Sequence, residues 1–236
     1  VQLGVKTGAN PVFLNPSAPI EATLLRWVIR GRDVRPFRAD RRVRIIWTHD
    51  AEGRVFPRLP PLATSWFERH RALLLARTDH AGGPPWTLFR VAPAAARHRV
   101  VWADLGRRLN ALALDDLTDR DRIPLNTCYV VAAPDAQTAR CLSAWLNSTW
   151  IRAAARVVAC PASGGFARFN GRTVASLPLP DAALGDPALA ELAQSGSQGT
   201  LVQESVDDIC AHHLCLSDTA RRTLAAVAGV DRDPGR

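Results

Sequence analysis

Apolar and turn-forming residues alternate over short distances in the first half of the chain, a pattern typical of strands. Residues 43–47 are rich in β-branched and aromatic side chains, and the same bias marks residues 86–91, 99–103 and 128–132. The short apolar run 12–14 is also assigned to sheet. This half of the chain is therefore predicted to be built largely from strands.

One stretch of the first half has helical spacing instead. Trp66, Phe67, Leu73 and Leu74 recur at intervals that place them on one face of a helix. Prolines precede this stretch and end the extended chain before it. We therefore predict a helix over residues 63–77.

The pattern changes to helices in the second half. Residues 136–146, with Asp135 as the amino-terminal cap, and residues 149–158 are predicted helices. A glycine turn at 163–165 and a short strand reaching residue 180 are expected to follow.

Beyond residue 180 the chain is predicted to be helical over 187–194, 201–215 and 217–230, with a Ser/Gly-rich link at 195–199. The expected fold class is α+β, a mixed sheet with packed helices followed by a C-terminal helical segment. We expect one domain over 1–180 and the helical segment over 181–236.

Composition supports a folded chain, since 47% of the 236 residues are hydrophobic. No apolar run is long enough to cross a membrane, and the first residues do not resemble a secretory signal. The five cysteines form no C-x-x-C pair, which favours reduced, mostly buried thiols and a cytoplasmic location. The chain has no methionine, so we expect it to be cut from a longer reading frame.

Charge is distributed unevenly along the chain. Residues 1–180 hold 26 Lys and Arg against 13 Asp and Glu, whereas residues 181–236 hold 4 against 9. A basic body with an acidic tail favours a surface that binds a polyanion, although arginine-rich usage in a GC-rich genome and a plain solvated face are alternatives. The densest cluster consists of Arg26, Arg30, Arg32, Arg35, Arg38, Arg41, Arg42 and Arg44.

Motifs for chemistry are weak. Gly83-Pro84-Pro85-Trp86 is the nearest match to the Pro-Pro-aromatic motif of amino-methyltransferases, but glycine lacks the side-chain acceptor that the first position needs. No glycine-rich turn for S-adenosylmethionine is present. The run 210–215 contains two cysteines and two histidines, and its spacing favours core packing over a zinc site. We therefore predict no catalytic residue, metal site or cofactor in this chain.

Several segments together resemble one known family, the C-terminal specificity domain of TaqI-like adenine-specific DNA methyltransferases and related single-chain restriction-modification enzymes. The segments that carry the resemblance are Gly4-Val5-Lys6-Thr7-Gly8-Ala9-Asn10, Arg30-Gly31-Arg32-Asp33-Val34-Arg35, Pro85-Trp86-Thr87-Leu88, Pro124-Leu125-Asn126-Thr127, Ser163-Gly164-Gly165 and Leu177-Pro178-Leu179-Pro180. The resemblance implies that residues 1–180 are a DNA target-recognition domain that clamps double-stranded DNA. A preceding domain would then hold S-adenosylmethionine and methylate adenine at N6, and a nuclease is a further expected partner.

The candidate DNA contacts form three groups. A glycine-flanked turn would bring three polar side chains to the DNA backbone, unless it is an ordinary hairpin turn. The arginine cluster supplies phosphate or guanine contacts, and a glycine-rich loop supplies a third group unless it is only a surface connection. Trp86 and Trp102 are assigned to the core. The candidate residues are Lys6, Thr7 and Asn10; Arg30, Arg32, Arg35 and Arg38; and Ser163, Arg168 and Asn170.

Two alternatives stay open at this point. The chain is either linked to its methyltransferase or is a free-standing specificity subunit that meets separate subunits through its acidic C-terminal helices. A basic RNA-binding accessory domain is the alternative of another class.

Overall fold

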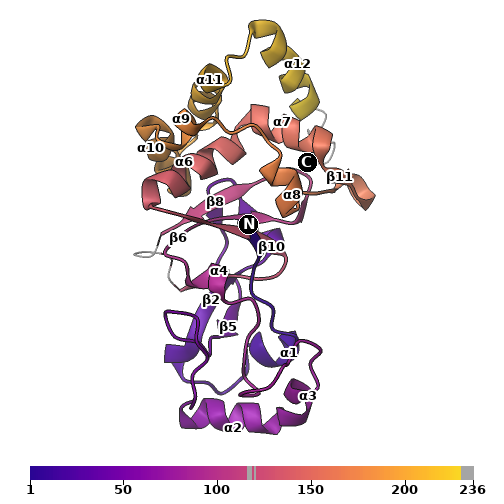
Figure 1. Cartoon of the computed structure of the whole chain (residues 1–236), viewed down its shortest axis with the longest axis vertical. Helices are drawn as coiled ribbons and strands as arrows, with labels where there is room; N and C mark the ends of the chain where they lie inside the picture. Colours follow the sequence, from indigo (N-terminus) through magenta and orange to yellow (C-terminus); the bar gives the residue numbers. More distant parts are fainter. Residues whose placement is uncertain (116–118, 120, 230–236) are drawn as a thin grey trace.

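The computed structural model describes residues 1–115, 119 and 121–229. It confirms the α+β class: mixed sheets with packed helices, followed by helices at the C-terminal end. Figure 1 shows an elongated molecule with a smaller region around α1, α2 and β2 at one end and a larger, helix-covered sheet at the other. No helix in the described ranges is long and apolar enough to cross a membrane.

A four-stranded antiparallel sheet forms the centre of the larger region. Alternation along β6 sends Val100 and Trp102 into a core shared with the helices, and Val101 and Ala103 into a second core on the opposite face. The sheet is therefore buried on both sides. Its strands, in order across the sheet, are β1 (Gln2–Leu3), β10 (Cys128–Ala133), β6 (His98–Ala103) and β8 (Ala111–Leu114).

Helices cover the first face of this sheet. Helix α6 packs against β6, β8 and β10, helices α10 and α11 pack on α6, and α12 packs on α7. The predicted cap is confirmed, because Oδ1 of Asp135 accepts a hydrogen bond from the backbone N of Thr138 (2.7 Å). The helices are α6 (Ala136–Asn147), α7 (Thr149–Val158), α8 (Gly171–Ala175), α9 (Asp181–Leu184), α10 (Pro187–Ser197), α11 (Gln203–His213) and α12 (Asp218–Gly229).

The predicted link at 195–199 is wrong in part, because residues 195–197 form the last turn of α10. Packing explains why residue 196 is a glycine, since a Cβ there would come within 2.7 Å of the Phe37 ring. The ring of Phe37 and the helix can approach closely only because that side chain is missing. Residue 230, the predicted end of the last helix, lies outside the described residues. The division at residue 180 stays a prediction.

The opposite face of the sheet is covered by residues 29–39, which we call the arginine cover. Ile29, Val34 and Ala39 of this segment pack on the apolar side chains of β6, β8 and β10. The cover consists of the end of β2, the 3-10 helix η2 (Gly31–Asp33), β3 (Val34–Arg35) and β4 (Arg38–Ala39). These apolar positions hold it to the sheet, and Arg32, Arg35 and Arg38 are exposed.

The smaller region has its own core and its own sheet. Strand β2 pairs antiparallel with β5 and parallel with β9. The rings of Phe13 and Phe67 lie 5.2 Å apart in the core beneath. Its elements are α1 (Asn10–Phe13), the 3-10 helix η1 (Ala22–Leu24), β2 (Leu25–Ile29), β5 (Arg44–Ile46), α2 (Pro61–Arg69), α3 (Arg71–Leu75), α4 (Ala92–Ala95) and β9 (Arg122–Pro124).

Strands are confirmed within 43–47, 99–103 and 128–132. The predicted helix 63–77 is present but divided at His70. Three predictions are wrong. Residues 12–14 belong mostly to helix α1, which has Pro11 in its first turn. After the glycine turn the strand is only β12 (Ala167–Arg168), residues 171–175 form helix α8, and no strand reaches residue 180. Residues 86–91 form only one bridge, between Phe89 and Lys6.

Of the five cysteines, Cys128, Cys141 and Cys210 are buried and Cys160 and Cys215 are exposed, and all five are free thiols. Trp102 is fully enclosed, as predicted, and its Nε1 donates to the backbone O of Phe169 (2.8 Å). Trp86 is only partly buried, although its ring packs beside Phe67 in the core of the smaller region.

Arg77 joins three separate segments of the smaller region. Its guanidinium is buried, lies between the rings of Phe13 and Phe89, and is surrounded by backbone oxygens. It donates to the backbone oxygens of Thr7 (2.6 Å), Leu74 (2.8 Å), Pro85 (2.7 Å) and Thr87 (2.9 Å). The amino-terminal turn, the end of α3 and the loop before Phe89 therefore depend on one side chain.

Replacement of Arg77 tests this dependence. Arg77→Met keeps the length of the side chain but leaves four buried carbonyl groups without a donor, so we expect the free energy of unfolding to fall by about 3 kcal/mol. Chemical denaturation measures the change. Arg71→Met, which removes only an exposed pair with Glu68, is the control and should cost about 0.5 kcal/mol or less. Similar losses in both variants would contradict the proposed role of Arg77.

Candidate nucleic-acid interface

The arginine cover presents three exposed cations. Arg32 lies in η2, and the pairing of β3 with β4 sets Arg35 opposite Arg38. Nη1 of Arg35 donates to the backbone oxygens of Arg32 (2.9 Å) and Val34 (3.0 Å), which fixes the direction of its guanidinium. The sheet beneath gives the three side chains a rigid support.

Arg30, the fourth predicted contact in the cluster, is engaged within the protein. Its Nε and Nη2 donate to the two carboxylate oxygens of Asp33 at 2.6 and 3.0 Å, and Asp33 is almost fully buried. Burial acts to raise the pKa of Asp33, but the hydrogen bonds and charge of Arg30, with a contribution from Arg32, outweigh it and hold that pKa below its usual value. Arg30 therefore stabilises the turn from which Arg32 projects.

The same turn is fastened to the sheet. The backbone N of Gly31 donates to Oγ1 of Thr127 (2.9 Å), next to the first residue of β10. A Cβ at Gly31 would lie 2.7 Å from the backbone O of Thr127, so only glycine fits. The motif residues 30–35 and 124–127 are thus in contact in the fold.

The amino-terminal turn is largely satisfied by its own contacts. Thr7 is buried, and its Oγ1 donates to Oδ1 of Asn10 (2.6 Å). Lys6 forms an ion pair with Asp79, and Gly8 adopts a φ of 67°. Of the three predicted contacts, Asn10 is exposed and Lys6 partly exposed, whereas Thr7 faces the interior.

The third predicted group lies on a small sheet of three strands, β11 (Cys160–Pro161), β12 (Ala167–Arg168) and β7 (Leu105–Gly106). Ser163 is exposed in the 3-10 turn η3 (Ser163–Gly165), and Arg168 forms an ion pair of 2.7 Å with Asp104. Asn170 caps α8, since its Oδ1 accepts from the backbone N of Thr173 (3.0 Å).

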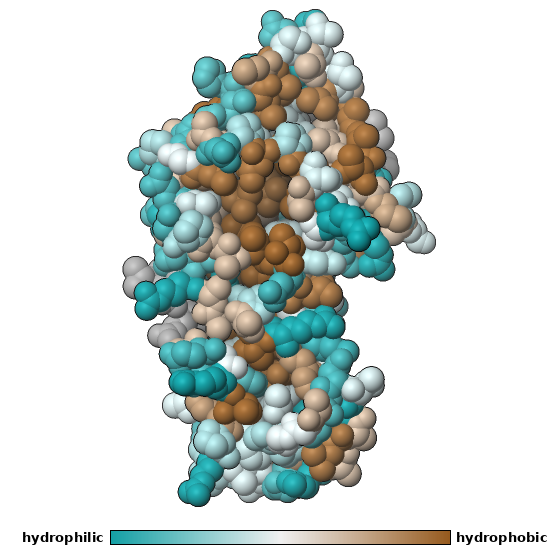
Figure 2. Space-filling model, viewed as in Figure 1, coloured by the Kyte–Doolittle hydropathy of each residue, from teal (hydrophilic) through white to brown (hydrophobic). Residues whose placement is uncertain are grey.

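Two of the three predicted groups are neighbours in the fold. Turn η2 contacts β7, and β7 pairs with β12, so the arginine cover adjoins the sheet that carries Arg168. The Lys6 turn leads into α1, in the other region of the molecule (Figure 1). Sequence reasoning missed Arg107, which follows β7 and lies with its Cζ 5.7 Å from the ring centre of Phe166. On the face shown in Figure 2, hydrophilic side chains gather beside α8 and at the waist between the two regions.

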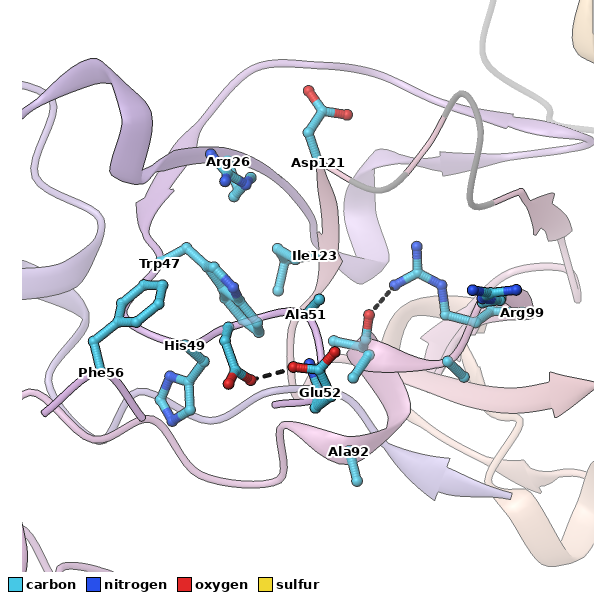
Figure 3. Close-up of a pocket in the computed structure, with 15 residues that line it drawn as sticks. Arg26, Trp47, His49, Ala51, Glu52, Phe56, Ala92, Arg99, Asp121 and Ile123 are labelled. Carbon is cyan, nitrogen blue, oxygen red and sulfur yellow. Dashed lines mark hydrogen bonds between the residues drawn. The ribbon is translucent and has the colours of Figure 1, made fainter. Parts of the chain in front are cut away.

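A separate cleft of about 820 Å³ lies near that waist. Figure 3 shows Trp47, His49 and Phe56 along one side of it, with Arg26 and Asp121 along another. Burial lowers the pKa of His49 to about 4, against a smaller opposing effect of Asp50, so the imidazole is neutral at pH 7. Among the described residues, no three His, Cys, Asp or Glu side chains converge as a metal site. Sequence reasoning did not find this cleft.

No protein-family model matches the chain, and no curated protein matches its sequence. Its structure is similar to that of the type IIL restriction-modification enzyme MmeI in complex with DNA, with a TM-score of 0.53 and 14% sequence identity. The match covers 100% of this chain and 33% of the MmeI chain, so the chain spans one third of the length of that enzyme. The similarity shows a shared fold, and the closer resemblance to TaqI-like specificity domains stays a prediction.

The buried His49 makes stability depend on pH. Because its pKa in the folded protein lies below that of the unfolded chain, the unfolded state binds more protons between pH 6.5 and about 4. Stability should therefore fall by up to roughly 3 kcal/mol as pH drops through this range. We expect His49→Asn to lose that part of the pH dependence, measured by denaturation at several pH values. An unchanged pH dependence in the variant would show that His49 is not buried in neutral form.

Proposed function

We propose that the chain is a DNA target-recognition domain of a restriction-modification enzyme that methylates adenine at N6. The observation that carries the proposal is the outward array of Arg32, Arg35 and Arg38 on a rigid sheet, in a fold shared with a segment of an enzyme solved with DNA. Guanidinium groups bind phosphate oxygens and guanine edges in pairs of hydrogen bonds, and release of counterions adds to the affinity.

The remaining candidate residues have different roles in this proposal, some as direct contacts and some as residues that position their neighbours. Arg168, beside the arginine cover, extends the basic surface, with Ser163 at the adjoining turn. Arg30 and Asn170 act by fixing the turns that present their neighbours. Lys6 and Asn10 would contact the DNA backbone from the smaller region, with Thr7 holding their turn.

The chemistry would lie outside this chain. S-adenosylmethionine would be held by a methyltransferase domain that is linked to this chain or associated with it, and a nuclease is a further partner. DNA recognition of this kind places the protein in the cytoplasm. The present residues would supply affinity and sequence preference.

Selection from a randomised duplex pool at low and moderate salt tests the proposal. We expect retention to fall steeply as salt rises, with a short motif enriched in the retained fraction. Arg32→Glu/Arg35→Glu/Arg38→Glu should weaken binding roughly 100-fold or more and reduce the slope of log K against log salt by about 2.7, or ~0.9 for each lost phosphate contact. Arg30 is left in place because its removal would strand the buried Asp33.

The matched control is Arg58→Glu/Arg69→Glu/Arg71→Glu, which changes the net charge equally at exposed positions of the smaller region. Equal losses in both triple variants would mean that only overall charge matters. Preference for structured RNA in competition would point to an RNA-binding domain. Normal binding by the first variant would reject the arginine cover as the interface.

A further inference from the structure

The hairpin formed by β11 and β12 holds one aromatic ring at its turn. Cys160 pairs with Arg168, and the backbone N of Ala162 donates to the backbone O of Phe166 (2.8 Å), which closes the loop. Gly164 and Gly165 have φ values of 70° and 76°, a region in which other side chains are strained. The loop conformation is therefore set by the main chain, and it fixes the position of Phe166.

Phe166 is unlike the other aromatic residues of this protein. The chain has seven Trp, one Tyr and seven Phe, all within the described ranges, and Phe166 alone belongs to the exposed class, at 36%. A Cβ on Gly164 would lie 3.7 Å from the Phe166 ring, so the missing side chain there leaves that edge of the ring with one neighbour fewer. An apolar ring kept accessible in this way is available to a binding partner.

The surroundings of the ring are basic. The guanidinium of Arg107 lies against it, and Arg168 stands two residues further along the hairpin. Residues 136–180 contain five arginines and no acidic residue, and Asp104 is the one carboxylate of residues 97–109, where it pairs with Arg168. The ring therefore lies in a region of positive charge.

We propose that Phe166 inserts between neighbouring base pairs of duplex DNA while Arg107 and Arg168 bind the flanking phosphates. Duplex DNA matches this pattern, since its stacked bases are apolar and its phosphates are negative on either side. The fixed loop keeps the ring in place before binding. The inference rests on the proposed DNA recognition and adds to it a side chain that opens a base step.

A short duplex from the retained fraction of the pool, carrying 2-aminopurine at each position in turn, tests the insertion. Wild-type protein should raise the fluorescence of 2-aminopurine several-fold at one step, because unstacking relieves its quenching. Phe166→Ala should abolish this rise and weaken binding roughly tenfold, with an unchanged salt slope because the phosphate contacts remain. Phe166→Trp should retain both properties.

The control is Leu201→Ala, which removes an apolar side chain that is 99% exposed in the link between α10 and α11 and should alter neither readout. Wild-type fluorescence and affinity in Phe166→Ala would overturn the insertion while leaving DNA recognition standing. That result would indicate that the ring, with the exposed Val157 and Val158 of α7, contacts a protein partner instead. Failure of the wild-type chain to bind any duplex would instead reject the proposed function, and the insertion with it.

Discussion

Burial of the four-stranded sheet on both faces is the constraint that places the surface proposed to bind DNA. Helices α6, α10 and α11 occlude one face, so the apolar side chains on the other require a separate cover. Ile29, Val34 and Ala39 supply it, and hydrophobic burial therefore fixes the residues between them. Arg32, Arg35 and Arg38 are held outward as a consequence of core packing, and need no dedicated scaffold of their own.

Arginine has two distinct uses in this protein, and the sequence does not separate them. One use is structural: Arg77 is buried and donates to backbone oxygens of the smaller region, and Arg99 is also buried. Arg152 contacts Leu109, Asn110, Asn147 and Gln203, and burial lowers its pKa to about 10, so it stays charged at neutral pH. The surface available to a polyanion is accordingly smaller than the count of arginines suggests, because these arginines are held within the protein.

Turn η2 contacts β7, so the arginine cover and the small sheet of β11, β12 and β7 are neighbours. In the proposed function, the cover would bind phosphate and the hairpin would contribute its accessible ring to the same interface. The chain shares its fold with a segment of a restriction-modification enzyme solved with DNA. The acidic C-terminal helices pack on α6 and α7, and α10 also approaches the arginine cover, where Gly196 lies against the ring of Phe37.

Local signals determined much of the fold. Strands β6 and β10 follow from β-branched runs, helices α6 and α7 follow from apolar spacing, and α6 also follows from its cap Asp135, because each depends on residues a few positions apart. Tertiary structure decided what depends on distant partners. Residues 86–91 are not a strand because Arg77 and Thr48 bind the carbonyl groups of Pro85, Trp86 and Thr87. The ring of Phe166 meets Arg107 only after the chain has folded, through hydrogen bonds between strands that no local pattern records.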